Sequence, residues 1–242
     1  MIYYNGSLYS PFAFFHNPRT SGSSISEYLI RHGCSESKAN HHLPIHSTFA
    51  FESKYRNLDN HYKFGFCRNP YSREYSFYSL HKKSTKNIEK LGIPTFKHYL
   101  IKKWIDGAYL DSTSHQYGYF CDTDGKLQVN VFKYEERVEA LKNIGENIKM
   151  DLNPEYRASP DGEYKRNIGA TQYEHYTEMY DNEMIDLLEP KLRLDMDAFG
   201  YTFDGNKEPR QVEFSFKQPD KLAYYFSDFV IAELEAHKYV NQ

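Results

Sequence analysis

Two short apolar runs, residues 11–15 and 63–67, are each followed by a polar turn and then by a stretch with helical spacing. Continuous apolar runs of this length are typical of buried strands. After the first turn, apolar residues recur at helical spacing over residues 25–29. After the second run, Asn69 suits a helix N-cap and Pro70 the first helical position. The pattern therefore predicts two strand–turn–helix units.

The rest of the chain continues the alternation of strands and helices. We expect strands at 127–134 and 212–216, an irregular loop at 111–125, and helices at 49–58, 96–104, 135–148, 181–199 and 220–238. This order predicts a three-layer α/β/α fold with a mostly parallel central sheet. Ligands bind such sheets beyond the carboxyl ends of the strands, which is where both polar turns are expected.

Composition and charge narrow the class of protein. The chain has 242 residues, 40% of them hydrophobic, and a net charge of −3, which favours one large globular domain without a basic nucleic-acid arm. Its cysteines, Cys34, Cys67 and Cys121, are too far apart to indicate a disulfide framework or a zinc site. No apolar run approaches the ~20 residues of a membrane span. We therefore expect a cytoplasmic protein that needs no metal.

The first turn, residues 19–24, has the composition of an anion site. It reads Arg-Thr-Ser-Gly-Ser-Ser and precedes a helix, whose first amides are unpaired donors at the positive end of the helix dipole. Small residues let a phosphate-sized anion approach those amides. The same residues are also typical of ordinary helix capping. The lysine of an ATP-hydrolysing P-loop is missing.

The second turn adds positive charge at the end of the second strand. Arg68 follows that strand, and Ser72, Arg73 and Ser76 lie on the first turns of the predicted helix. A guanidinium beside a hydroxyl can bind a phosphate. A salt bridge or a surface cap is the alternative for Arg68 alone.

Taken together, the two turns resemble the sulfotransferases that use 3′-phosphoadenosine 5′-phosphosulfate (PAPS), in their carbohydrate-modifying and bacterial family 2 branch. Residues 16–25 resemble the 5′-phosphosulfate loop I-P-K-T-G-G-T-S-I, and residues 64–78 resemble the 3′-phosphate motif F-x-F-V-R-N-P-Y-x-R-x-x-S-x-Y. Residues 124–135 are similar to the family strand that ends in R-F-E. Residues 195–201 resemble its D-x-x-x-F-G-Y ending.

This resemblance implies a P-loop-like sulfotransferase domain over 1–204, on which a strand and a helix at 205–242 would pack. PAPS would be the co-substrate, and the acceptor would be a small molecule or glycan hydroxyl. The implied cofactor-binding residues are Arg19, Thr20, Ser21, Gly22, Ser23, Ser24, Arg68 and Ser76. Arg166, in the loop before the last family helix, is expected to close over the nucleotide, and a solvated basic loop is the alternative. Arg19 stands where the family has lysine and is expected to take over its contact with the transferring group.

The general base is expected in the linker between the two motifs. The segment from His42 to His46 resembles a family H-x-P/T-x pattern, so His42 is the first candidate, with His41 and His46 as rivals. A solvated loop histidine is the alternative for each. His16 is expected to shape the first loop instead.

Two other functions remain open at this level. A kinase of P-loop-like fold should show a Lys-Ser/Thr pair and an aspartate that holds Mg²⁺, and neither is evident. A protein that binds PAPS without turnover is the second alternative, because Arg19 departs from the family lysine. The sequence does not indicate an oligomeric state.

Overall fold

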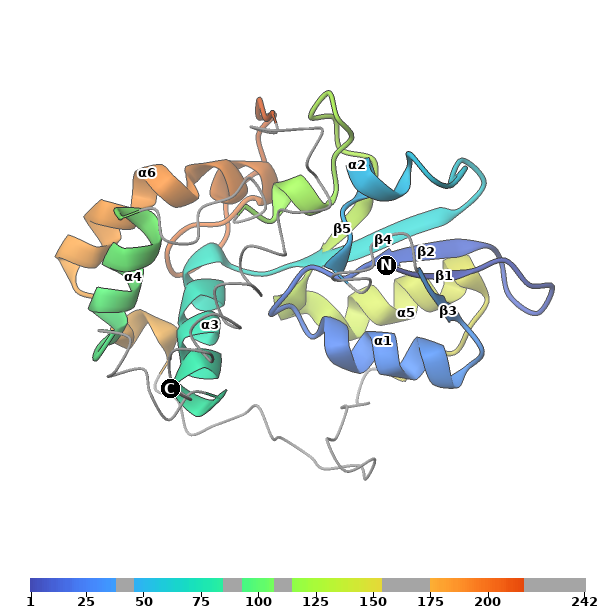
Figure 1. Ribbon diagram of the computed structural model, residues 1–242, viewed down its shortest axis with the longest axis horizontal. Coiled ribbons are helices and arrows are strands. Elements are labelled where there is room, and N and C mark those ends of the chain that lie inside the picture. Colours follow the sequence, from blue (N-terminus) through green and yellow to red (C-terminus); the bar gives the residue numbers. More distant parts are fainter. Residues whose placement is uncertain (38–45, 85–92, 107–114, 154–174, 216–242) are drawn as a thin grey trace, which may run out of the picture.

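The computed structural model describes residues 1–37, 46–84, 93–106, 115–153 and 175–215 (Figure 1). The predicted helix at 220–238 lies outside these residues. Within them, no helix has the length and apolar character needed to cross a membrane.

A five-stranded sheet forms the centre of the fold, in the order β3-β1-β2-β4-β5. Its strands are β1 (Ile2–Tyr4), β2 (Phe12–Phe15), β3 (Ser35–Glu36), β4 (Tyr62–Cys67) and β5 (Asn130–Lys133). β2, β4 and β5 pair in parallel, whereas β1 pairs antiparallel with both β2 and β3. The α/β class is therefore confirmed. The described sheet is mixed, so the prediction of mostly parallel pairing is not confirmed.

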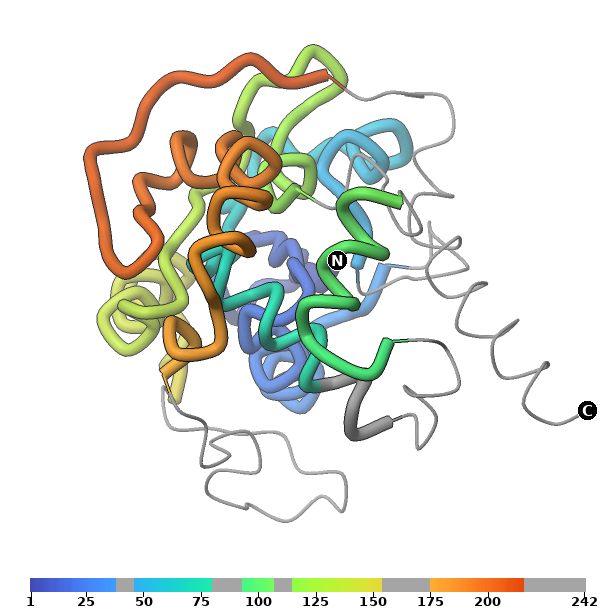
Figure 2. The backbone as a smooth tube through the Cα atoms, turned by 90° about the vertical axis from the view of Figure 1, so that its left-hand side faces the viewer, coloured from blue at the N-terminus to red at the C-terminus, as the bar shows by residue number. Residues whose placement is uncertain are grey.

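Six α-helices and several short 3-10 turns complete the described structure (Figures 1 and 2). The helices are α1 (Gly22–Arg31), α2 (Phe49–Glu52), α3 (Pro70–Ser84), α4 (Phe96–Trp104), α5 (Arg137–Ile148) and α6 (Asn182–Phe199). The 3-10 turns used below are η3 (Tyr117–Tyr119), η4 (Tyr134–Glu136) and η5 (Tyr176–Met179). Both predicted strand–turn–helix units are confirmed: β2 leads into α1, and β4 leads into α3.

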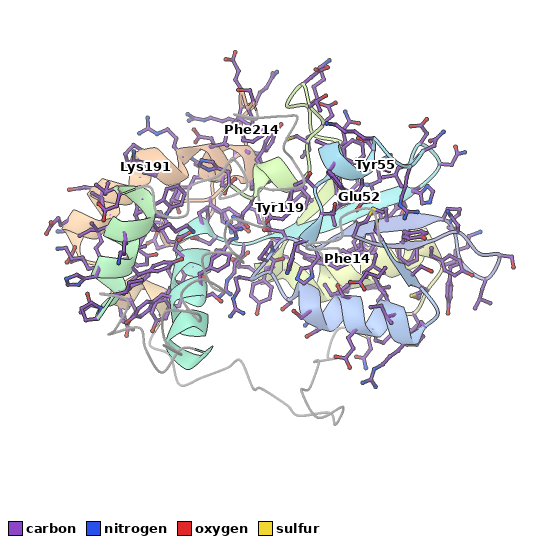
Figure 3. All side chains as sticks on the ribbon, in the orientation of Figure 1. Phe14, Glu52, Tyr55, Tyr119, Lys191 and Phe214 are labelled. Carbon is purple, nitrogen blue, oxygen red and sulfur yellow. The ribbon has the colours of Figure 1, made fainter. Side chains whose placement is uncertain are left out.

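The sheet divides the core into two layers because alternate strand residues point to opposite faces. Phe12 and Phe14 of β2 pack with the buried residues of α1 and α5. Ala13 and Phe15 pack with α2, α3, α4 and α6 on the opposite face. Phe14 and Tyr119, labelled in Figure 3, belong to these two separate clusters. Helices therefore cover both faces of the sheet.

A glycine in β4 lets the segment around η3 approach the sheet closely. A Cβ atom at Gly65 would overlap the ring of Phe120 and would lie 2.9 Å from the carbonyl oxygen of Phe15. Phe120 and Tyr119 are both fully buried. This contact seats η3 against the sheet at the edge where the two polar turns begin.

Three expectations about local structure were wrong. The helix predicted over 49–58 is only the four-residue α2. Residues 212–215 form no strand; instead, Phe214 packs on Tyr117, with the two ring centroids 5.6 Å apart. The sequence predicts Val138, Leu141 and Ile144 on one face of α5; Leu141 and Ile144 are buried there, but Val138 is 65% exposed.

Candidate active site

The two polar turns leave the sheet at the same edge, side by side. β2 and β4 are adjacent and parallel, and their pairing ends with Phe15 opposite Gly65. The chain then enters the first turn at His16 and the second at Arg68. In Figure 1 the first turn leads into α1 below the sheet and the second into α3 beside it.

The backbone of the first turn is strongly curved. Arg19 (φ 68°) and Ser21 (φ 64°) are both left-handed, a conformation that costs a residue with a side chain of order 1–3 kcal/mol. The Thr20 hydroxyl donates to the carbonyl oxygen of Asn17 at 2.7 Å and closes the turn from inside. The side chain of Thr20, predicted as a ligand, is therefore buried within the loop.

Gly22 is small for a reason that the sequence did not show. A Cβ atom there would overlap the imidazole of His16, which is buried between this glycine and Phe14. His16 also lies 3.4 Å from the hydroxyl of Ser26, measured from Nδ1 to Oγ. The expectation that His16 shapes the first loop agrees with these contacts.

The N-terminus of α1, like that of α5, lacks the side-chain cap found on α4 and α6. Thr95 caps α4 and Asp181 caps α6 through side-chain oxygens, whereas the N-cap residue of α1, Ser21, makes no such bond. The first turn of α1, which contains Ser23 and Ser24, also has no acidic residue. Because the first amides of a helix have no intrahelical acceptor, this end of α1 fits an anionic group.

The second turn begins α3 and presents Arg68. Asn69 caps the helix, since its Oδ1 accepts from the backbone N–H of Tyr71 at 3.0 Å. Nε of Arg68 donates to the hydroxyl of Ser72 at 2.9 Å, and its guanidinium lies 4.9 Å from the centre of the Tyr134 ring. Within the described part of the chain, Arg68 forms no ion pair with a carboxylate.

Direct contacts between predicted binding residues join the turns. Nε of Arg19 donates to Oγ of Ser76 at 3.0 Å, and Nη1 of Arg68 lies 3.4 Å from the carbonyl oxygen of Arg19. Residues 57 and 49 positions apart in the sequence thus converge on one place. The structure therefore brings together Arg19, Ser76 and Arg68, three of the predicted binding residues.

Arg68 is a partly buried cation. Burial lowers the pKa of Arg68 from its usual value, and the nearby Tyr134 and Glu135 partly oppose this shift. Arginine stays protonated at neutral pH in spite of such shifts. A partly buried cation is stabilised most by a partner that brings negative charge and several acceptors, as a phosphate does.

Among the predicted bases, the structure describes His46. Its Nδ1 lies 3.1 Å from the carbonyl oxygen of His16, and the two imidazole centroids are 4.3 Å apart. A carbonyl only accepts, so Nδ1 carries the proton and Nε2 is the basic nitrogen. Burial lowers the pKa of His46 to about 4, so the ring is neutral at pH 7. His41, His42 and Arg166 lie outside the described residues.

Three residues of this site were not among the predicted binding residues. Gln116 bonds to both turns, Asp195 bonds to the backbone of Gln116, and Arg73 donates to the backbone and side chain of the first turn. Arg73 and Asp195 stand within the motifs quoted above, which was a usable signal. Gln116 lies in the segment predicted to be an irregular loop, and no local sequence pattern identified it.

No cluster of three or more His, Cys, Asp or Glu side chains suited to a metal ion occurs among the described residues.

Comparison with known proteins supplies the family. A family model described as the sulfotransferase family matches residues 9–202, which include both turns, β5 and α6. Neither curated proteins nor solved structures give a significant match. The match covers most of the chain and confirms the resemblance drawn from the two turns. With its two turns side by side at the sheet edge, this chain belongs to the sulfotransferase family, whose members transfer sulfuryl groups.

Proposed function

We propose that this protein transfers the sulfuryl group of PAPS to a hydroxyl group of a carbohydrate, on a P-loop-like fold. The N-terminus of α1 and Arg19 would hold the 5′-phosphosulfate, and Arg68 with Ser76 the 3′-phosphate. Arg166, from the segment 154–174, is proposed as a further nucleotide contact. These roles follow the family motifs that the residues match.

One observation carries the proposal. Arg68 is a partly buried cation at the carboxyl end of β4 that has no carboxylate partner in the described structure, and it lies beside the first turn, which leads into the N-terminus of α1, where the N-cap residue makes no side-chain bond. Burying an uncompensated charge is costly unless the molecule gains from it elsewhere. A ligand with an anion at each end would compensate this charge and use the amides of α1 at the same time.

The proposed reaction is an in-line displacement at sulfur. The acceptor oxygen forms a bond to sulfur while the bond between sulfur and the 5′-phosphate oxygen breaks, and its electrons stay on that phosphate oxygen. Arg19 and the first amides of α1 would stabilise the charge that develops there. The proton of the acceptor hydroxyl passes to a base on the protein.

His46 is the described residue that we propose as this base, with His42 as the other candidate. The bond from its Nδ1 to the carbonyl oxygen of His16 leaves Nε2 able to take a proton. With a pKa of about 4, His46 is a weak base, but the negative charge of bound PAPS would raise this pKa toward 7. The carbohydrate acceptor is supported by the family branch alone.

Binding of the product analogue adenosine 3′,5′-bisphosphate, without metal, tests the nucleotide site. The Arg68→Ala, Ser76→Ala variant should lose at least a hundredfold in affinity by titration calorimetry. Ser79→Ala is the matched control, because Ser79 lies on the same helix and, among the described residues, its hydroxyl donates to the Tyr75 carbonyl alone. Retention of parental affinity by the folded double variant would reject the proposed site. Tight binding of Mg-ATP in preference to the bisphosphate would instead favour a kinase.

Transfer of labelled sulfate from PAPS to a set of glycans tests the chemistry. His46→Asn keeps a donor near the His16 carbonyl, because asparagine Nδ2 lies close to the position of Nδ1, but it removes the basic nitrogen Nε2, so kcat should fall about 10²–10⁴-fold. The affinity for the bisphosphate should stay within about threefold of the parent. An unchanged kcat would exclude His46 and leave the role to the linker histidines.

A further inference from the structure

The side chain of Gln116 forms three hydrogen bonds that touch both turns. Its Oε1 accepts from the backbone N–H of Arg68 at 2.9 Å and from Nδ2 of Asn17 at 3.0 Å. Its Nε2 donates to the carbonyl oxygen of Arg68 at 2.7 Å. Gln116 is 0% exposed. The amide can therefore adopt only one orientation, because the reverse would set donor against donor and acceptor against acceptor.

These bonds begin where the sheet stops. Backbone pairing between β2 and β4 ends with Phe15 opposite Gly65. Just beyond, Nδ2 of Asn17 donates both to the carbonyl oxygen of Phe66 at 3.1 Å and to Gln116. Side chains thus continue the connection between the strands after their backbones separate. This link adds to the direct contacts that Arg19, Arg68 and Arg73 make between the two turns.

Gln116 is itself held from the other side of the site. Its backbone N–H donates to Oδ2 of Asp195 at 2.8 Å, and the N–H of Tyr117 donates to Oδ1 at 3.0 Å. Asp195 lies on α6 and is 1% exposed. A buried carboxylate with two amide donors is firmly oriented, so α6 fixes the position of Gln116.

We propose that Gln116 is a positioning residue that sets the spacing between the two turns and so makes the site selective for a nucleotide with an anion at both ends. This inference rests on the proposed function. A ligand with two phosphates gains from the second turn only if that turn is already at the right distance from the first. A ligand with one phosphate needs only one turn, and the spacing does not affect it.

Gln116→Met tests this role, since methionine has a similar length but cannot form the three bonds. We expect its affinity for adenosine 3′,5′-bisphosphate to fall at least tenfold, about 1.4 kcal/mol. Its affinities for adenosine 5′-phosphate and adenosine 3′-phosphate, measured separately by calorimetry, should change less than threefold. Gln128→Met is the matched control, because Gln128 makes one side-chain bond, to Asp122, away from the turns.

Asp195→Asn provides the second variant. It leaves Gln116 and both turns intact but replaces one acceptor oxygen with a donor group, which opposes a backbone N–H. The same pattern is expected with a smaller loss for the bisphosphate, and this variant decides the question if Gln116→Met does not fold.

Equal losses for all three ligands, or no loss for the bisphosphate, would show that Gln116 does not set the spacing. If the parent protein itself binds the bisphosphate no better than the two monophosphates, both this inference and the proposed nucleotide site are wrong. A parent that prefers the bisphosphate, with a Gln116→Met variant that loses all ligands alike, overturns the inference alone.

Discussion

Replacing Arg68 by methionine should remove nucleotide binding without reducing the stability of the ligand-free protein. Arg68 is a partly buried cation with no carboxylate partner in the described structure, and its described contacts are the Ser72 hydroxyl, the Arg19 carbonyl and the Tyr134 ring. Methionine keeps much of the packing against the ring, since sulfur and aromatic rings attract each other. The substitution therefore removes the buried charge while it keeps much of the packing, so its effect on stability reports mainly the free-energy cost of the charge.

The expected magnitudes follow from these contacts. The variant loses the 2.9 Å bond to Ser72, worth about 0.5–1.5 kcal/mol, and a weaker 3.4 Å contact. The variant also avoids the free-energy cost of desolvating a guanidinium, which is several kcal/mol for a well-buried ion and less for a partly buried one. The free energy of unfolding without ligand should therefore change by no more than about 1 kcal/mol, or rise. Binding of the bisphosphate should weaken by about 2–5 kcal/mol, roughly 30- to 5,000-fold.

Thermal unfolding with and without adenosine 3′,5′-bisphosphate measures both effects. At a hundred times its Kd the ligand should stabilise the parent by about 2.7 kcal/mol, a shift in Tm of about 5–11 °C for a chain of this size. The same concentration should shift Arg68→Met by about 4 °C at most. Arg193→Met is the control, because Arg193 is exposed and pairs only with Glu189 one helical turn away. A ligand-free variant that is destabilised by more than about 2 kcal/mol, or one that keeps the full shift, would refute this reasoning.

Three further predictions concern the first loop and its histidines. Gly22→Ala should destabilise the protein by about 1–3 kcal/mol in urea unfolding, because the new methyl group overlaps the buried His16 ring, and His16→Ala should relieve much of that loss. Ser21→Gly should stabilise the protein by up to about 1 kcal/mol, because glycine adopts φ 64° without strain. Ser23→Gly, in α1, is the control and should destabilise it by about 0.5–1 kcal/mol. The opposite order of stabilities would show that the loop is not strained. Burial lowers the pKa of His46 to about 4, below the ~6.5 of an unfolded histidine. As the pH drops, His46 therefore takes up a proton in the unfolded chain before it does so in the folded protein. The free energy of unfolding should fall as the pH drops from about 6.5 toward 4. Urea unfolding at pH 7 and pH 5 should show a smaller fall for His46→Gln, and an equal fall would contradict the assignment.

The binding motifs could be read from the sequence because each is local. Residues 11–15 and 63–67 are short apolar runs, Asn69 caps α3 as expected, and the helix predicted over 181–199 forms as α6. A strand followed by a polar turn and a helix is specified within about twenty residues, so its pattern can be recognised in the sequence. The family then followed from the spacing of a few residues in the two turns.

Other parts of the fold depend on partners far away in the chain. β1 and β3 have three and two residues, too few for a periodic pattern, and they are strands because of their antiparallel neighbours. Val138 has the apolar character of a core residue but faces away from the buried side of α5. Sequence periodicity alone could not choose the face of α5 that meets the sheet.

The sequence by itself determined the α/β class, the two polar turns and the family. Only the tertiary structure showed that Arg19 meets Ser76, that His46 is held by His16, and that Gln116 joins the turns. The physical reason is distance along the chain: Asn17 and Gln116 are 99 residues apart, and a hydrogen bond between such residues leaves no periodic or compositional trace. It exists only because the sheet, η3 and α6 bring the two side chains together.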